Sequence, residues 1–164
     1  MKISDLLADI AVVKQAIEVS HIALDSREIT DGGVFFAVAG ATRHGLQFAR
    51  QVQQQGAVAI VYDPAKQGEL FAKGITGVAL FAVESLTEKL GEMAARFYGR
   101  PSEQLSVIGI TGTNGKTSCS QFLAQAMADT GVIGTLGWGC YPYLQRTSNT
   151  TPDPLLIQKI LIHP

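Results

Sequence analysis

A glycine-rich stretch ending in Gly-Lys-Thr constrains this chain more than any other feature of its sequence. The apolar, β-branched run 105–110 predicts a strand before it, and the apolar spacing over 121–127 predicts a helix after it. Between them lie Gly112, Thr113, Asn114, Gly115, Lys116, Thr117 and Ser118. A strand, a glycine turn and a helix in this order are typical of a loop that holds the phosphates of a nucleotide.

The residue types of this loop match what a bound phosphate needs. Glycines let backbone N–H groups turn inward around an anion, and the N-terminus of the following helix adds unpaired donors and a partial positive charge. Lys116 can reach the β- and γ-phosphates of ATP, which makes it the candidate catalytic residue, and the Thr117 hydroxyl can ligate Mg²⁺. The alternative is a glycine-rich turn in which Gly-Lys-Thr occurs by chance.

Composition excludes several classes of protein. Of the 164 residues, 46% are hydrophobic and 16% are charged, so the chain can bury a core and is not disordered. The net charge of −1 argues against a nucleic-acid partner, which would need a basic face. The two cysteines lack metal or redox spacing, no signal-peptide pattern is present, and the apolar runs are strand-sized. We therefore expect a cytoplasmic protein with no membrane partner.

Residues 1–98 alternate between strand and helix patterns. Apolar runs predict strands at 19–24, 34–38, 57–62 and 78–83, and helical spacing follows at 46–55 and 86–97. The runs lack polar alternation, which indicates strands buried on both faces, as in a largely parallel α/β sheet. Ser4 and the Ser85–Glu88 pair are predicted to cap helices.

A polar segment containing Gly and Pro, 99–104, predicts a linker to a second unit, 105–164. That unit is predicted to hold the phosphate loop, a short strand at 132–136, an irregular segment or hairpin at 137–142, and a last helix at 155–161. A phosphate-loop sheet needs more strands than this to cover both faces. The expectation is that the chain is an N-terminal piece of a longer enzyme, truncated early in its ATP-binding α/β domain.

The chain resembles the Mur ligase family over nearly its whole length. The common phosphate-loop pattern requires a glycine at position 110, where this chain has Ile110, and the shorter T-G-T-N-G-K-T form resembles Mur ligases and folylpolyglutamate synthetases. The resemblance continues through L-D-S-R at 24–27, D-G-G-V-F-F-A-V-A-G at 31–40, G-A-V-A-I-V at 56–61, G-T-L-G at 134–137 and N-T-T-P at 149–152. These motifs favour the branch that adds the third amino acid to UDP-N-acetylmuramoyl-L-alanyl-D-glutamate.

The resemblance implies roles for individual residues. In a UDP-sugar-binding domain, 1–98, Leu24 and Ser26 would contact the uracil and diphosphate end of the substrate. A loop closing on the nucleotide would consist of Ala41, Thr42 and Arg43. The phosphate loop would bind ATP with Thr117 on Mg²⁺, and the muramoyl-peptide end would be held by Asn149, Thr150 and Thr151.

The reaction implied by the resemblance is an ATP-dependent amide ligation. ATP would phosphorylate the D-glutamate carboxylate of the UDP-N-acetylmuramoyl-dipeptide, and an amino acid would then displace the phosphate. A modified lysine, acidic metal ligands and the amino-acid site are expected beyond residue 164, so we expect the fragment alone to be inactive and the full-length enzyme to be a monomer. Whether diaminopimelate, lysine or another amino acid is added is not specified by these residues.

Plainer interpretations stay open for several residues. Ser26 could sit in an Asp-Ser turn, and Thr150 and Thr151 could merely cap the last helix. Structural roles are expected for His21, His44 and His163, and Cys119 is expected to be a small buried residue. Two other functions remain as alternatives: another Mur-type ligase, such as MurF or folylpolyglutamate synthetase, or a UDP- or nucleotide-binding module without catalysis.

Overall fold

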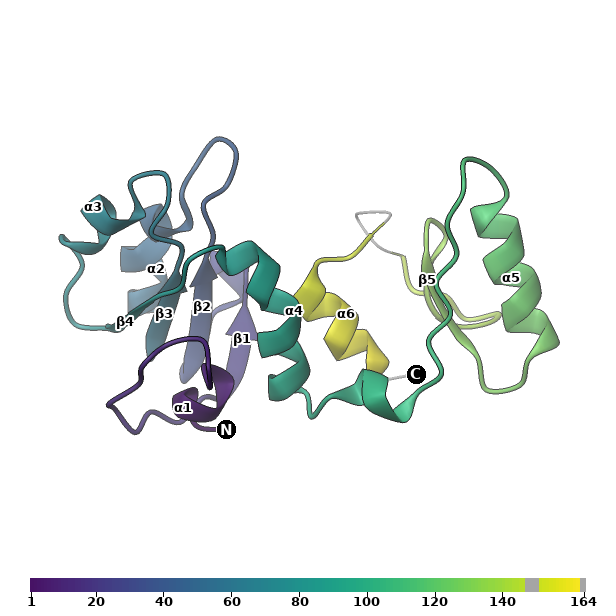
Figure 1. Cartoon of the computed structure of the whole chain (residues 1–164), viewed down its shortest axis with the longest axis horizontal. Coiled ribbons are helices and arrows are strands. Elements are labelled where there is room, and N and C mark those ends of the chain that lie inside the picture. The colour runs from purple at the N-terminus through teal and green to yellow at the C-terminus, as the bar shows by residue number, and fades with distance from the viewer. Residues whose placement is uncertain (147–150, 163–164) are drawn as a thin grey trace. The chain divides into compact units, whose positions relative to one another are not determined.

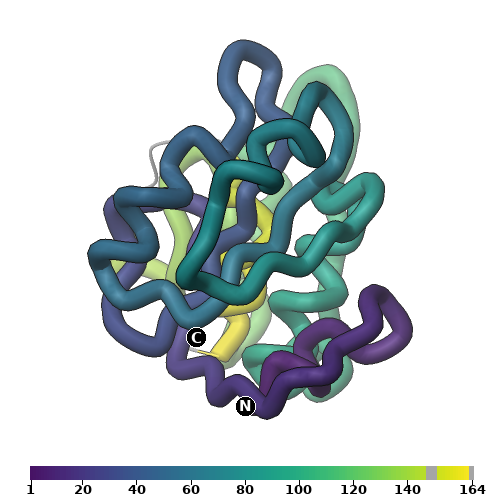
Figure 2. Tube along the Cα trace, turned by 90° about the vertical axis from the view of Figure 1, so that its left-hand side faces the viewer, coloured from purple at the N-terminus to yellow at the C-terminus, as the bar shows by residue number. Residues whose placement is uncertain are grey.

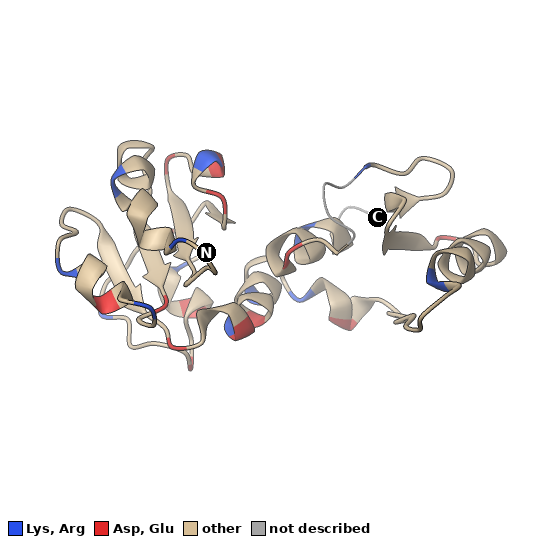
Figure 3. Cartoon of the chain, turned by 90° about the horizontal axis from the view of Figure 1, so that it is seen from above, with Lys and Arg blue, Asp and Glu red and all other residues tan. Residues whose placement is uncertain are grey.

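The computed structural model describes residues 1–146 and 151–162 (Figure 1). The chain divides into two compact units, Met1–Phe97 and Tyr98–Pro164. In Figure 3 the acidic and basic residues are interspersed along both units, and no single element collects one sign of charge. Recognition of a phosphate must therefore come from local groups.

The first unit is built on a four-stranded sheet. Its strands are β1 (His21–Ala23), β2 (Gly33–Ala37), β3 (Ala59–Tyr62) and β4 (Ala79–Ala82). All neighbours are parallel and the order is β1-β2-β3-β4, which confirms the predicted parallel α/β sheet. β1, β3 and β4 lie within their predicted ranges and are shorter, because the ladder ends where paired neighbours end, whereas β2 begins one residue before its predicted range of 34–38 and has the same length.

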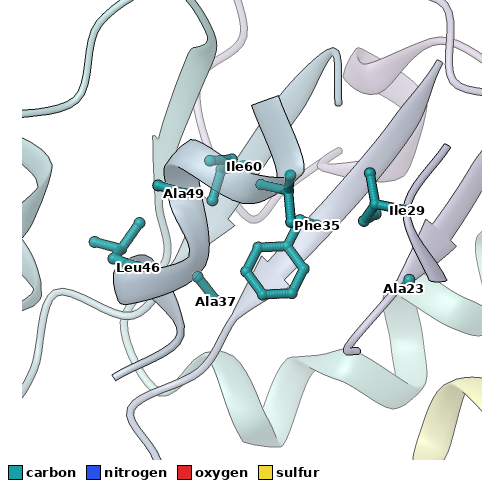
Figure 4. Packing of buried hydrophobic residues seen from close by; sticks show 8 residues of the cluster. Ala23, Ile29, Phe35, Ala37, Leu46, Ala49 and Ile60 are labelled. Carbon is teal, nitrogen blue, oxygen red and sulfur yellow. The ribbon is translucent and has the colours of Figure 1, made fainter. Parts of the chain in front are cut away.

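Both faces of this sheet are covered. Phe35, Ala37 and Ile60 point to one face, as Figure 4 shows. They pack with residues of the 3-10 helix η2 (Gly45–Phe48) and of α2 (Ala49–Gln54). Alternate residues of the same strands, such as Phe36 and Val61, point to the other face and are fully buried. In Figure 1, α1 (Ile3–Leu6) and α4 (Leu86–Phe97) lie in front of the sheet and α2 lies behind it. Burial on two sides explains the unbroken apolar runs.

The helix N-termini differ from the predicted caps. Lys2, not Ser4, is the N-cap of α1, and the Ser4 hydroxyl bonds to Asp5. Ser85 has φ 51°, outside the extended region that an N-cap residue normally adopts. The Leu86 N–H at the start of α4 instead donates to Asp63 Oδ2 at 3.1 Å. The expected cap is thus replaced by a side chain from the end of β3.

A short helix that the sequence did not predict, α3 (Gly68–Ala72), follows the loop after β3. Its five residues are too few to show a helical period.

The second unit contains η3 (Pro101–Gln104), α5 (Lys116–Ala126), β5 (Gly131–Gly134), β6 (Gly137–Cys140) and α6 (Pro154–Leu161). β5 and β6 form an antiparallel hairpin, so of the two alternatives for 137–142 the hairpin is correct for the first four residues. η3 lies within the segment predicted as a linker. Among the described residues, no helix is long and apolar enough to cross a membrane.

The strand predicted at 105–110 is wrong for this structure. These residues carry no strand assignment, and Val107 and Ile108 are 67% and 57% exposed. An apolar run becomes a strand only when a neighbour completes its hydrogen bonds, and within the described part of this unit β5 and β6 pair with each other. The helix after the loop is confirmed, but it begins at Lys116, five residues before its apolar pattern starts.

Two candidate phosphate-binding sites

The glycine loop lies directly before α5. Gly112 has φ 149° and Gly115 has φ 79°, values that side-chain-bearing residues rarely adopt. The first α-helical hydrogen bond runs from the Cys119 N–H to the Gly115 carbonyl at 2.9 Å. The three preceding N–H groups, of Lys116, Thr117 and Ser118, therefore have no acceptor within the helix and are available to an anion.

The Lys116 ammonium lies over this loop. Its Nζ donates to the carbonyl oxygen of Gly112 and, at 3.3 Å, to that of Thr113. The side chain is exposed, as are the residues from Gly112 to Gly115. A cation held beside free N–H donors forms a concentrated positive site at a helix N-terminus.

The loop also fits a nucleotide-bound magnesium ion. Thr117 is half-buried in the first turn of α5, with a hydroxyl suited to a hard cation. In residues 1–146 and 151–162, no group of three or more His, Cys, Asp or Glu could hold a metal. A magnesium ion bound at the Thr117 hydroxyl would share the phosphate oxygens of the nucleotide.

The second candidate site lies at the carboxyl edge of the parallel sheet. Leu24 and Ser26 follow β1, and the loop with Ala41, Thr42 and Arg43 follows β2. Since β1 and β2 are parallel neighbours, their carboxyl ends meet at one edge, where open α/β sheets bind ligands. The Ser26 side chain is 8% exposed, and its hydroxyl donates to Gln51 Oε1 at 3.4 Å.

The loop after β2 is a tight hairpin, which we call the 39–44 hairpin. An antiparallel bridge joins Ala39 to His44, and Ala41, Thr42 and Arg43 are exposed at its tip. It protrudes from the carboxyl edge in Figures 1 and 2. A Cβ at Gly40 would lie 2.6 Å from the Arg43 carbonyl oxygen, so the turn requires glycine there.

A pocket of about 210 Å³ opens on one side of the hairpin. It is lined by residues 40–44 together with Gln47, Lys66, Gln67 and Phe71. Leu24 and Ser26 are not among the lining residues. The pocket thus lies between the loops after β2 and β3 and includes Ala41, Thr42 and Arg43, whereas Leu24 and Ser26 follow β1.

Two of the histidines are structural. His44 Nδ1 accepts from the Leu46 N–H at 3.1 Å, so Nε2 carries the hydrogen and donates to the Asp63 carbonyl at 2.8 Å. His21 Nε2 accepts from the Thr30 N–H at 3.1 Å. These hydrogen bonds confirm the structural roles expected for both residues; His163 lies outside the described residues.

The last predicted substrate contacts are Asn149, Thr150 and Thr151, which precede α6. Asn149 and Thr150 lie outside the described residues, and Thr151 is exposed. The cap of α6 is Asp153, whose Oδ1 accepts from the Leu155 and Leu156 N–H groups at 2.9 and 3.0 Å. The capping role considered for Thr151 is therefore wrong, because Asp153 adjoins the helix and accepts two of its free N–H groups.

Cys119 is exposed, which corrects the expectation of a buried residue. It lies on α5, of which Ala124 is the buried residue, so this helix presents most of its surface to solvent.

Asp25 and Arg27 form a local pair beside Ser26. The Asp25 carboxylate accepts from the Arg27 backbone N–H at 2.9 Å and from the guanidinium Nε at 2.9 Å. The side-chain hydrogen bond from Arg27 is the main cause that lowers the pKa of Asp25. Arg27 is thereby held against Asp25.

The bond between Asp25 and Arg27 predicts how Asp25 titrates. In a carbon-detected NMR titration, Asp25 should titrate below its ordinary value of 3.8, and Arg27→Gln should move the midpoint back upward. Because the folded-state pKa is lowered, the stabilisation by the pair is present above the unfolded-state pKa and is lost as pH falls through the folded-state pKa. The pair is exposed, so the effect on stability should be small. An unchanged midpoint in Arg27→Gln would contradict the assignment.

A parallel α/β unit followed by a glycine loop at a helix N-terminus defines a phosphate-loop nucleotide-binding protein. Comparison with known families makes this more specific. The profile of the Mur ligase family, catalytic domain, matches residues 18–98, and that of the Mur ligase middle domain matches residues 110–163. The chain belongs to the Mur ligase family.

Its curated relatives include ligases of one kind. A UDP-N-acetylmuramoyl-L-alanyl-D-glutamate–2,6-diaminopimelate ligase from Xanthomonas oryzae pv. oryzae is 42% identical over 93% of this chain and 30% of the relative. The ligase of that name from Xylella fastidiosa is 43% identical over 98% of this chain and 32% of the relative. The chain thus spans about a third of the length of these relatives.

Solved structures agree in fold. A structure of a UDP-N-acetylmuramoyl-L-alanyl-D-glutamate–2,6-diaminopimelate ligase superposes with a TM-score of 0.66 at 24% identity, covering 98% of this chain and 32% of that one. MurF ligase from Thermotoga maritima in complex with ADP gives a TM-score of 0.55 at 23% identity, covering 88% of this chain and 29% of that one. At these identities the likeness establishes the fold alone.

Proposed function

We propose that this chain carries the UDP-substrate-binding and ATP-binding parts of a MurE-type ligase, which adds the third amino acid to UDP-N-acetylmuramoyl-L-alanyl-D-glutamate. The observation that carries the proposal is the glycine loop with Lys116 at the N-terminus of α5, in a chain 42% identical to such ligases over 93% of its length. The whole enzyme would act in the cytoplasm as a monomer. Because the relatives are named for 2,6-diaminopimelate, that diamino acid is the first amine to assay.

The reaction has two steps. The D-glutamate carboxylate attacks the γ-phosphorus of ATP, the bond to the β,γ-bridging oxygen breaks, and an acyl phosphate and ADP result. The free amine of the amino acid then attacks the acyl carbon, loses a proton and expels inorganic phosphate. ATP supplies the driving force, because a carboxylate and an ammonium group do not condense in water.

The residues of the glycine loop serve the first step. The N–H groups of Lys116, Thr117 and Ser118 bind phosphate oxygens, and the Lys116 ammonium neutralises charge on the transferring group. Gly112, Thr113, Asn114 and Gly115 supply the turn. The Thr117 hydroxyl would hold a magnesium ion, which would supply further neutralisation of the phosphate charge.

The first unit, Met1–Phe97, which we call the front unit, binds the UDP-linked substrate. Leu24 and Ser26 bind the uracil and diphosphate end at the carboxyl edge of the sheet, and Ala41, Thr42 and Arg43 close over the nucleotide. Asn149, Thr150 and Thr151 hold the muramoyl-peptide end. Holding both substrates converts a bimolecular encounter into a reaction between positioned groups.

The test of this assignment is UDP binding by calorimetry. The chain should bind UDP, and Ser26→Ala should weaken binding by about tenfold, because a charged partner loses its hydrogen bond. Ser20→Ala is the matched control: Ser20 precedes β1 and Ser26 follows it, so the same change is made at opposite edges of the sheet. Equal affinities for wild type and Ser26→Ala, with equal melting temperatures, would refute the role of Ser26.

A further inference from the structure

The segment after β3 holds the base of the 39–44 hairpin. Lys66 Nζ donates to the Gly40 carbonyl oxygen at 3.0 Å and to that of Ala39 at 3.3 Å. We propose that Lys66 is a positioning residue for nucleotide binding: it fixes the hairpin whose tip, Ala41 to Arg43, closes on the UDP end of the substrate. This inference rests on the function proposed above for that tip.

The backbone around Lys66 has an unusual conformation. Lys66 has φ 49° and Gln67 has φ 71°, so two successive residues with side chains are left-handed. The turn is held by a bond from the Ala65 N–H to Asp63 Oδ1 at 2.9 Å and one from the Gly68 N–H to the Ala65 carbonyl at 3.0 Å. Strained conformations of this kind are concentrated at functional sites.

The same segment also holds the other end of the hairpin. His44 Nε2 donates to the Asp63 carbonyl at 2.8 Å, and a Cβ at Gly68 would lie 2.1 Å from that oxygen and 2.8 Å from Nε2. Glycine at position 68 thus permits this close approach. Residues 63–68 therefore hold the hairpin at both ends, through Lys66 at Ala39 and Gly40 and through Asp63 at His44.

The hydrogen bonds from Lys66 and to Asp63 are made at the base of the hairpin, whereas its tip is exposed. The side chains of Ala41, Thr42 and Arg43 are solvent-accessible and cannot be positioned by burial. A loop that is already ordered loses less conformational freedom when it binds a ligand, and this saving appears as affinity. Loss of the Lys66 ammonium should therefore weaken nucleotide binding, because the base of the hairpin loses its hydrogen bonds to Lys66.

The experiment compares Lys66→Met, Lys66→Arg and Lys73→Met in the 164-residue chain. Lys73 is an exposed lysine at the C-terminal end of α3, so its substitution matches the change in charge. By calorimetry, Lys66→Met should weaken UDP binding about tenfold. Lys66→Arg should restore most of the affinity, because a guanidinium donates to the same carbonyls. Lys73→Met should match wild type, and Mg²⁺–ATP affinity should be unchanged in all three.

Tryptic cleavage of the Arg43–His44 bond provides a readout that does not depend on UDP. The bond should be cut several-fold faster in Lys66→Met than in wild type and Lys73→Met. Equal cleavage rates in all three, or a UDP affinity unchanged by Lys66→Met, would overturn the proposal. If wild type does not bind UDP, the nucleotide role of the hairpin is wrong. Faster cleavage in Lys66→Met would then support only the role of Lys66 in ordering the hairpin.

Discussion

Lys116→Ala and Lys116→Arg are both expected to lower ligase turnover by about a hundredfold or more, while UDP-substrate affinity stays within about twofold. Negative charge shifts between the β- and γ-phosphates as the phosphoryl group is transferred, and the Lys116 ammonium lies over the loop that would hold them. Arginine keeps the charge, but its planar, wider head cannot occupy the same place above the carbonyls of Gly112 and Thr113. The UDP substrate is held by the front unit and should bind normally.

Turnover and the dissociation constant of the UDP substrate should be measured in a protein spanning the full length of the relatives. Lys159→Ala, which removes an exposed lysine from α6, is the matched control and should leave turnover unchanged. Melting temperatures should not change in the Lys116 variants, because this side chain is exposed. Near-normal turnover by Lys116→Arg would show that the ammonium does not contact the reacting phosphates.

Asp63→Ala is expected to lower the free energy of unfolding of the front unit by about 2–5 kcal/mol. The carboxylate is 6% exposed and accepts from the Ala65 N–H at 2.9 Å and the Leu86 N–H at 3.1 Å. Alanine would leave the buried Leu86 N–H without its partner, deprive the Ala65 N–H of its acceptor, and remove a negative charge from the N-terminus of α4. The substitution should therefore loosen both the loop after β3 and the first turn of α4.

Urea unfolding followed by circular dichroism measures this effect. Asp63→Asn retains one acceptor oxygen and should lose about half as much stability as Asp63→Ala. Asp5→Ala, at an exposed position in α1, is the control and should stay within about 0.5 kcal/mol of wild type. An Asp63→Ala midpoint equal to that of Asp5→Ala would exclude the long-range cap of α4.

The parallel sheet of the front unit was predictable because its signals are local. The apolar runs 34–38 and 57–62 are long enough for a strand and contain no polar alternation, which requires cover on both faces. The structure supplies that cover with α2 on one side and with α1 and α4 on the other. The glycine turn and the helix after it were also predictable from local residues. Gly112 and Gly115 adopt the positive φ angles that glycine permits, and α5 begins at Lys116.

Other features depended on residues far apart in the sequence. The run 105–110 has the composition of a strand, but a ladder requires a neighbour, and among the described residues β5 and β6 pair with each other. Ser85 resembled an N-cap, yet the N-terminus of α4 is bound by Asp63, 23 residues earlier. No sequence period reports which carboxylate folds back onto which helix.

The sequence determined which residue types could bind phosphate. The glycine loop contains a lysine and a threonine, and the loop after β1 contains Ser26 beside Arg27. The tertiary structure determined the hydrogen-bond partners of the polar side chains near the second site. Arg27 is held by Asp25, Ser26 bonds to Gln51, and Lys66 is joined to the 39–44 hairpin. The physical reason is that residue chemistry is carried by each side chain, whereas its hydrogen-bond partner depends on which segments the packed sheet brings together.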